Sequence, residues 1–192
     1  MRVMDSVLDV PQPYVVVVSG PPGAGKTTLG WELSRRLHVP FLSRDDVKTS
    51  LHVTHRSNDP DEVWRFAGLA FDIFYETIIR LADAGVSLVA EAAFHAGYAE
   101  EPISRLATHC RVIHVLLTTD GQVALDRYTK RARAGERHPA HNDEQFASDM
   151  ASGAKEVGVY RVSLPHPTLE VDGADGWQPS IDEIVSFVNK SR

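Results

Sequence analysis

A glycine-rich motif near the start of the sequence predicts the most specific chemistry. Residues 20–27 read Gly-Pro-Pro-Gly-Ala-Gly-Lys-Thr and fit the phosphate-loop pattern G-x-x-x-x-G-K-[ST] at every fixed position. Glycines let backbone N–H groups turn toward an anion, and the helix that follows adds its positive N-terminus. We expect Lys26 to reach the terminal phosphates of a nucleotide, with an exposed side chain when none is bound, and Thr27 to offer its hydroxyl to Mg²⁺. The predicted nucleotide contacts are Gly20, Gly23, Ala24, Gly25, Lys26, Thr27 and Thr28.

Acidic residues follow two other apolar runs. Asp45 and Asp46 come directly after residues 40–43, where a carboxylate could accept a proton from an acceptor hydroxyl. The same spacing also suits a helix cap with acids in the first turn, and spacing alone does not separate the two interpretations. Glu91 closes another apolar run and is expected to organise Mg²⁺ or its water shell opposite Thr27. The alternative for Glu91 is a solvent-facing carboxylate.

A cationic segment lies in the second half of the chain. Between residues 127 and 141, five basic residues stand against one acid, a net charge of +4, which leaves −10 elsewhere in a chain whose total is −6. Arg127 and Arg131 are four residues apart and share a helical face. We expect a mobile lid at about residues 127–142 that closes arginines over a transferring phosphate. The alternative is a solvated basic helix end.

Five apolar runs alternate with helical patterns and are predicted to form the strands that position these residues. Nearly continuous apolar strands joined by helices indicate a parallel sheet with helices on both faces, whose ligands bind at the carboxyl ends of the strands. A long helix is predicted from Asp59 to Gly85, with an apolar face at Phe66, Ala70, Phe74 and Ile78. The predicted strands are residues 14–19, 40–43, 86–91, 111–118 and 168–171.

Composition excludes several classes of protein. With 192 residues and 43% hydrophobic content, we expect one α/β domain covering residues 1–192, rather than a fibrous or disordered chain. No apolar run approaches the ~20 residues of a membrane helix, so we expect a cytoplasmic protein without membrane contact. The single cysteine, Cys110, cannot form an internal disulfide and is expected to be buried and inert. A charge of −6 disfavours a nucleic-acid partner that covers the whole surface.

Residues 14–141 resemble the P-loop kinase group that includes polynucleotide 5′-hydroxyl kinases, zeta toxins and chloramphenicol phosphotransferase. The resemblance rests on residues 20–28 and on residues 43–48, Ser-Arg-Asp-Asp-Val-Lys, which match the group's S-x-D-x-x-R element with Lys48 in place of the usual arginine. It implies an α/β P-loop NTPase fold with strand order 2-3-1-4-5. It also implies that Asp45 is the general base, that Arg131 is the lid arginine, and that Arg127 contacts the nucleotide one turn earlier.

Together these features predict a kinase that uses ATP (or GTP) and Mg²⁺ to phosphorylate a hydroxyl of a small molecule, with an antibiotic or nucleoside-like acceptor. Catalysis is assigned to Asp45, Lys26 and Arg131. A polynucleotide 5′-hydroxyl kinase and a nucleotide-dependent switch without an acceptor are the alternatives, and the chain is expected to be a monomer or homodimer. The predicted acceptor contacts are Asp45, Lys48, Phe94, His95, Tyr98 and Arg137.

Overall fold

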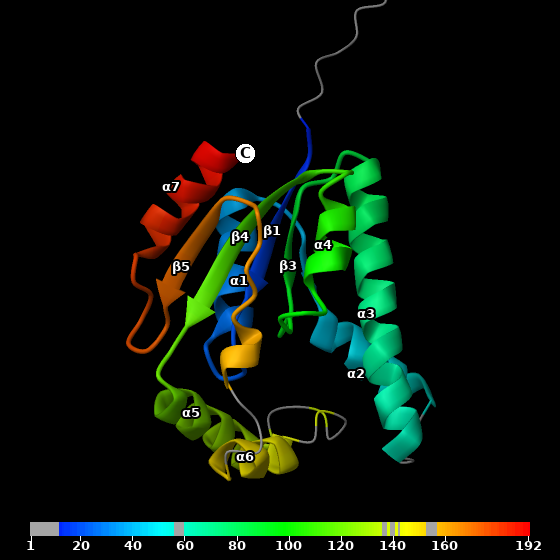
Figure 1. Cartoon of the computed structure of the whole chain (residues 1–192), viewed down its shortest axis with the longest axis vertical. Coiled ribbons are helices and arrows are strands. Elements are labelled where there is room, and N and C mark those ends of the chain that lie inside the picture. The colour runs from blue at the N-terminus through cyan, green and yellow to red at the C-terminus, as the bar shows by residue number, and fades with distance from the viewer. Residues whose placement is uncertain (1–11, 56–59, 136–137, 139–140, 142, 153–156) are drawn as a thin grey trace, which may run out of the picture.

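A five-stranded parallel sheet organises the chain (Figure 1). The computed structural model describes residues 12–55, 60–135, 138, 141, 143–152 and 157–192. The strand order β2-β3-β1-β4-β5 confirms the predicted order, and each strand lies within two residues of its predicted bounds at both ends. The strands are β1 (Tyr14–Ser19), β2 (Phe41–Ser43), β3 (Leu88–Glu91), β4 (Arg111–Thr118) and β5 (Thr168–Asp172).

Helices cover both faces of the sheet because the central strands are apolar on both sides. Every residue of β1 is buried: Val16 and Val18 face helices α1 (Lys26–Leu37) and α7 (Ile181–Ser191), whereas Val15 and Val17 face α3 (Pro60–Asp83) and α4 (Glu100–Leu106). Figure 1 shows α3 and α4 on one side of the sheet and α7 beyond its opposite edge. The sheet is therefore the middle of three layers.

The apolar face predicted for the long helix is confirmed. Phe66, Ala70, Phe74 and Ile78 of α3 are all buried, and the last two belong to the core cluster on β1 and β3. The predicted cap Asp59 lies outside the described residues. Just after α3, Gly85 takes a positive φ of 78°, a conformation that glycine adopts without a steric penalty. This turn sends the chain directly into β3.

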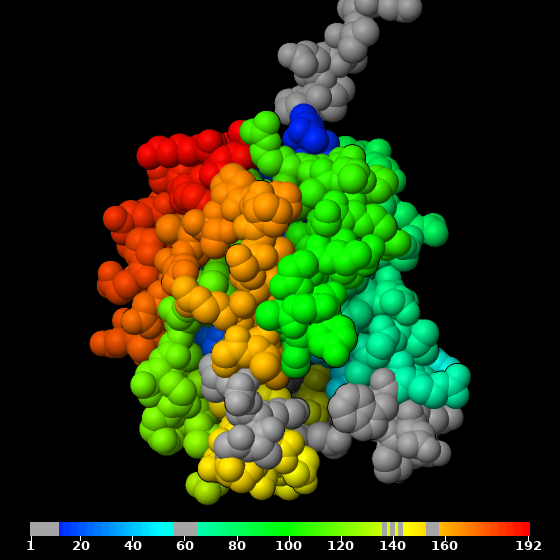
Figure 2. All heavy atoms as spheres, viewed as in Figure 1, coloured from blue at the N-terminus to red at the C-terminus, as the bar shows by residue number. Residues whose placement is uncertain are grey.

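Four elements gather at the carboxyl end of the sheet (Figure 1). They are α2 (Arg44–His55), α5 (Gly121–Ala134), α6 (Asp143–Ala151) and the short 3₁₀ helix η2 (Val157–Tyr160). Asp120 caps α5 by accepting hydrogen bonds from the Gln122 and Val123 backbone N–H groups. Figure 2 shows the chain after η2, in orange, crossing the front of the molecule beside α4 in green. The predicted lid segment, at about residues 127–142, begins within α5 and ends just before α6.

Cys110 is 2% exposed, which confirms its predicted burial, and this burial raises the pKa of its thiol to about 11. No helix in the described part of the chain combines the length and hydropathy that a membrane span needs.

Candidate active site

The glycine-rich loop connects β1 to α1 at the carboxyl edge of the sheet. Gly25 occupies the N-cap position of α1 with φ 94°, and no side chain caps the helix there. The first-turn N–H groups and the helix dipole therefore point at the loop without a protein carboxylate in the way. This arrangement suits a phosphate group.

Two close backbone approaches clamp the loop from either side. A Cβ atom on Gly23 would lie 2.4 Å from the Ala124 carbonyl oxygen of α5, and one on Gly173, just after β5, would lie 2.5 Å from the Ala24 carbonyl oxygen. Arg127 joins these two sides by donating hydrogen bonds to the carbonyl oxygens of Gly173 at 2.7 Å and Ala174 at 2.6 Å. Arg127 therefore positions the loop's surroundings here, and its contact with a nucleotide stays a prediction.

Lys26 does not extend into solvent, and the expectation of an exposed side chain was wrong. It is 7% exposed, and its Nζ donates a hydrogen bond of 3.0 Å to the Pro21 carbonyl oxygen within the loop. The reason is local. The loop places a backbone carbonyl oxygen within reach of the Lys26 ammonium, which donates a hydrogen bond to it instead of to water. The ammonium is consequently already held over the cradle in which a phosphate would bind.

A chain of hydrogen bonds links the ends of four elements, α1, β3, β2 and α2. The Thr27 hydroxyl donates to Glu91 Oε2 at 3.4 Å, and the Ser43 hydroxyl donates to the same oxygen at 2.9 Å. Ser43 Oγ in turn accepts from the Asp45 backbone N–H at 3.3 Å. Glu91 is 4% exposed, so the alternative of a solvent-facing carboxylate is excluded. The parallel register that pairs Ser43 with Glu91 brings these groups together.

The oxygen donors Thr27 and Glu91 fit a hard divalent cation. Mg²⁺ prefers oxygen ligands and keeps several waters and phosphate oxygens, so it needs few protein groups. Among the described residues, no three or more His, Cys, Asp or Glu side chains gather so that they could hold a metal ion by themselves. One hydroxyl and one carboxylate beside a phosphate cradle match the magnesium arrangement.

The predicted acceptor residues divide into two groups. His95 packs edge-on against Tyr160 of η2 with ring centroids 4.6 Å apart, and the neighbouring Ala96 N–H donates to the Val159 carbonyl oxygen at 2.8 Å. Tyr98 is 82% exposed. The expectation that Phe94 contacts the acceptor was wrong. Its side chain is 1% exposed and packs against Phe74 and Tyr75 in the core. Its aromatic character serves the core.

Two histidines of the lid segment lie against α2. Thr49 Oγ1 and His141 Nε2 share a hydrogen bond of 2.8 Å, and the rings of His52 and His138 lie 6.4 Å apart. Burial, with the nearby charges of Lys48 and His138, lowers the pKa of His52. Lys48 thus lies on the side of α2 that faces the lid.

Arg131 lies over the Tyr128 ring at 4.8 Å, and Tyr128 packs against Phe146 of α6. The predicted acceptor residue Arg137 lies outside the described residues. The last turn of α5 and helix α6 therefore form one packed unit around Tyr128, and Arg131 is part of it.

The family of the chain follows from a comparison with known proteins. Residues 15–155 match the family model described as the AAA domain. The chain belongs to the AAA domain family. Two curated shikimate kinases, from Aliivibrio salmonicida (strain LFI1238) and Aliivibrio fischeri (strain ATCC 700601 / ES114), are each 27% identical over 81% of this chain and 90% of their own length. The narrower resemblance to polynucleotide kinases, zeta toxins and chloramphenicol phosphotransferase stays a prediction.

Solved structures share the whole architecture of this AAA domain chain. A protein from Chloroflexus aurantiacus, provisionally described as a kinase, superimposes with a TM-score of 0.79 at 26% identity, covering 94% of this chain and 99% of that one. A sugar kinase from Janibacter sp. HTCC2649 superimposes with a TM-score of 0.61 at 18% identity, covering 93% of this chain and 95% of that one. A gluconokinase from Sinorhizobium meliloti 1021 superimposes with a TM-score of 0.54 at 17% identity, covering 93% of each chain. The fold is that of a P-loop kinase.

A buried polar network beneath the loop of this AAA domain was missed by sequence reasoning. Ser19 Oγ, at the end of β1, shares a hydrogen bond of 2.6 Å with His114 Nε2 of β4, whose Nδ1 lies 3.3 Å from Thr168 Oγ1 of β5. Burial, with a smaller effect of nearby His166, lowers the pKa of His114 to about 4, so the ring is neutral at pH 7. The only signal in the sequence was a histidine inside an apolar strand.

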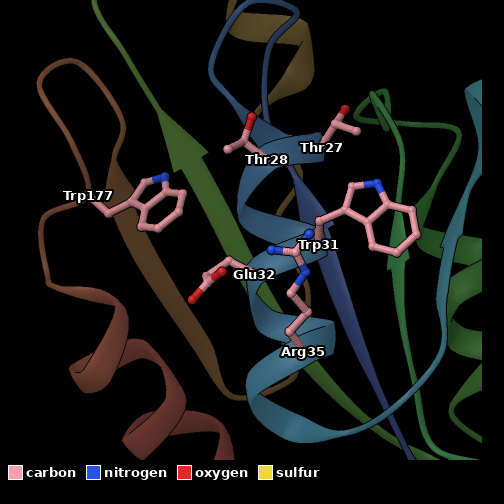
Figure 3. A pocket seen from close by; sticks show the side chains of 6 residues that line it. All are labelled: Thr27, Thr28, Trp31, Glu32, Arg35 and Trp177. Atoms are coloured by element: carbon pink, nitrogen blue, oxygen red, sulfur yellow. The ribbon is translucent and has the colours of Figure 1, made fainter.

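Figure 3 shows a cleft that starts at the loop's threonines and runs along the exposed side of α1. Its volume is about 440 Å³, and Trp31 and Trp177 flank it. Trp31 is 49% exposed, and the centroid of its ring lies 4.7 Å from that of the Phe41 ring. The residues that line this cleft include Thr27 and Thr28 of the predicted nucleotide site and none of the predicted acceptor contacts.

Proposed function

We propose that this chain is a kinase that transfers the γ-phosphoryl group of ATP to a hydroxyl of a small molecule. The observation that carries the proposal is the chain of contacts from Thr27 through Glu91 and Ser43 to the backbone N–H of Asp45, because it places the residue with a carboxylate suited to proton transfer beside the phosphate cradle. The shikimate kinases, the sugar kinase and the gluconokinase to which the chain is similar also support a small acceptor.

In the proposed reaction, the acceptor hydroxyl oxygen forms a bond to the γ-phosphorus while the bond from that phosphorus to the β,γ-bridging oxygen breaks. The hydroxyl proton passes to the Asp45 carboxylate, and ADP leaves. Lys26 and the first-turn N–H groups of α1 hold the phosphates, and Arg131 stabilises the charge that develops on them. Thr27 and Glu91 would hold Mg²⁺, which supplies electrostatic stabilisation of the phosphate oxygens.

An acceptor screen tests the proposal. The protein, MgATP and candidate acceptors are incubated and analysed by mass spectrometry for the gain of one phosphate. The candidates are nucleosides, hydroxyl-bearing antibiotics, sugars, hydroxy acids and 5′-hydroxyl oligonucleotides. We expect a small molecule to gain phosphate, with no transfer by a folded Lys26→Ala protein, because the motif places that ammonium on the transferring phosphate.

Two results would contradict the proposal in different ways. Labelling of oligonucleotides alone, with acceptor affinity falling steeply between about 50 and 200 mM salt, would indicate a polynucleotide kinase. Slow ADP formation that no acceptor stimulates would indicate a nucleotide-dependent switch. A small acceptor should instead show weak salt dependence, because the acidic body of the chain offers few cations for a phosphate backbone.

A further inference from the structure

Arg44 is a partly buried arginine directly beside the proposed general base. It is the first residue of α2, and its side chain is only 14% exposed. Its guanidinium carbon lies 4.5 Å from the centre of the Phe71 ring on α3. An aromatic ring covers one face of a guanidinium while leaving the N–H groups at its edge able to donate hydrogen bonds.

The hydrogen-bonding capacity of this guanidinium is incompletely used. Its Nη1 pairs with Asp45 Oδ1 at 3.3 Å, and in the described part of the chain that is its one ion pair. Its Nε is buried and has no hydrogen-bond partner among the described residues. A buried polar group without a partner is costly, and a buried charge more so, unless a ligand completes its contacts.

Two tyrosines lie close enough to Arg44 to feel its charge. Its positive charge acts on Tyr75 of α3 and on Tyr160 of η2, lowering their pKa values against burial, which raises both and has the larger effect. The pKa of Tyr160 remains about 12, so its phenol is uncharged at neutral pH. Tyr160 also contacts His95, which is one of the predicted acceptor contacts.

Arg44 also offsets the departure of this chain from the S-x-D-x-x-R element. Lys48 replaces the arginine of that element, and an ammonium cannot make the planar two-point contact that a guanidinium makes to an oxyanion. Arg44 stands four residues earlier on α2, so the two side chains share one side of that helix. The guanidinium group that position 48 lacks is therefore present one helical turn earlier, at Arg44.

We propose that the acceptor of this kinase carries an oxyanion, a carboxylate or a phosphate, and that Arg44 binds it next to the hydroxyl that Asp45 deprotonates. The inference rests on the proposed function and adds the chemical class of the acceptor to it. Arg44 is then a specificity-determining residue: it contacts the non-reacting anionic group, pairs with Asp45 and holds both groups in one geometry.

The test compares matched acceptors that differ only in charge: hydroxy acids against their methyl esters, and sugar phosphates against the free sugars. We expect the wild type to phosphorylate an anionic member with kcat/KM at least tenfold above its neutral partner. Arg44→Gln should lower that kcat/KM about 10- to 100-fold, chiefly through KM, because a hydrogen-bonded charge pair is lost. Arg44→Lys should fall between the two proteins. A preference for hydroxy acids over their esters would identify the bound group as a carboxylate, and a preference for sugar phosphates over free sugars would identify it as a phosphate.

Arg36→Gln is the matched control, because Arg36 is an exposed residue of α1 that pairs with Glu32 and Asp182. It should behave as wild type toward every acceptor. Equal use of charged and neutral members, or an Arg44→Gln protein that keeps the wild-type preference, would overturn the role of Arg44 and leave the proposed kinase intact.

A binding measurement separates failure of this inference from failure of the proposed function. Calorimetric titration of the acceptor panel into protein saturated with MgADP requires no turnover. Anion binding that Arg44→Gln weakens tenfold or more supports the inference even if no acceptor gains phosphate, a result that would count against the kinase proposal alone. Absence of anion binding to the wild type, or equal binding by both proteins, would overturn the inference.

Discussion

Asp45 and its neighbour Asp46 provide a matched pair for testing the proton acceptor. Asp45 pairs with Arg44, whereas Asp46 is exposed. We predict that Asp45→Asn lowers turnover about 10²- to 10⁴-fold with little change in nucleotide affinity, because a positioned base is lost. Asp46→Asn should have a much smaller effect. Steady-state kinetics of both variants measure this, and the reverse order would assign the base to Asp46.

Thr27 tests the proposed cation site at a single hydroxyl. Its Oγ1 lies 3.4 Å from Glu91 Oε2, so Thr27→Ala removes one of the two protein oxygens expected near Mg²⁺. We predict that the Mg²⁺ concentration for half-maximal activity rises about tenfold, equivalent to about 1.4 kcal/mol. Thr27→Ser keeps the hydroxyl and should restore the wild-type value. A threonine that acts only in packing would show no such rescue.

At the scale of elements, the packing of the loop against α5 makes two of its glycines unequal. A Cβ on Gly23 would collide with the Ala124 backbone oxygen, whereas one on Gly25 meets nothing within 4 Å, and both residues have positive φ. We predict that Gly25→Ala lowers the free energy of unfolding by about 1–2 kcal/mol through backbone strain alone. Gly23→Ala should cost about 3 kcal/mol or more, because α5 must also shift. Urea unfolding measures both, and equal losses would refute the close approach.

At the scale of the whole molecule, stability should depend on pH through His114. Burial lowers its pKa to about 4 from the ordinary 6.5, so between these values the unfolded chain binds a proton that the folded chain does not. Its contribution is intact above pH 6.5 and is lost as the pH falls to 4, by about 3 kcal/mol in total.

The variant His114→Gln keeps hydrogen-bonding capacity toward Ser19 and Thr168 without a titratable ring. Urea unfolding across pH 4–7 should therefore show a shallower loss of stability toward acid in this variant, with about one proton fewer taken up on unfolding near pH 5. His52 and His166, whose pKa values burial also lowers, leave some dependence in both proteins. Parallel curves for variant and wild type would contradict the prediction.

Sequence patterns located the strands and the long helix because their signals are local. The unbroken apolar run of β1 and the helical spacing of Phe66, Ala70 and Phe74 are each patterns among residues close together in the sequence. Phe94 was misread because an aromatic residue beside a predicted site has the same local appearance whether it faces a ligand or the core. Only its packing against Phe74 and Tyr75 distinguished the two.

By itself, the sequence determined the phosphate loop, the acids Asp45 and Glu91 near the ends of two other strands, and the succession of apolar strands and helices that indicates a parallel sheet, because these depend on residue type and short spacing. The tertiary structure decided which side chains meet. Arg127 holds carbonyl groups 46 and 47 residues away, Thr27 meets Glu91 across 64 residues, and Ser19 meets His114 across 95. Strand order and register create such contacts, and no local pattern encodes a distance between segments that folding alone brings together.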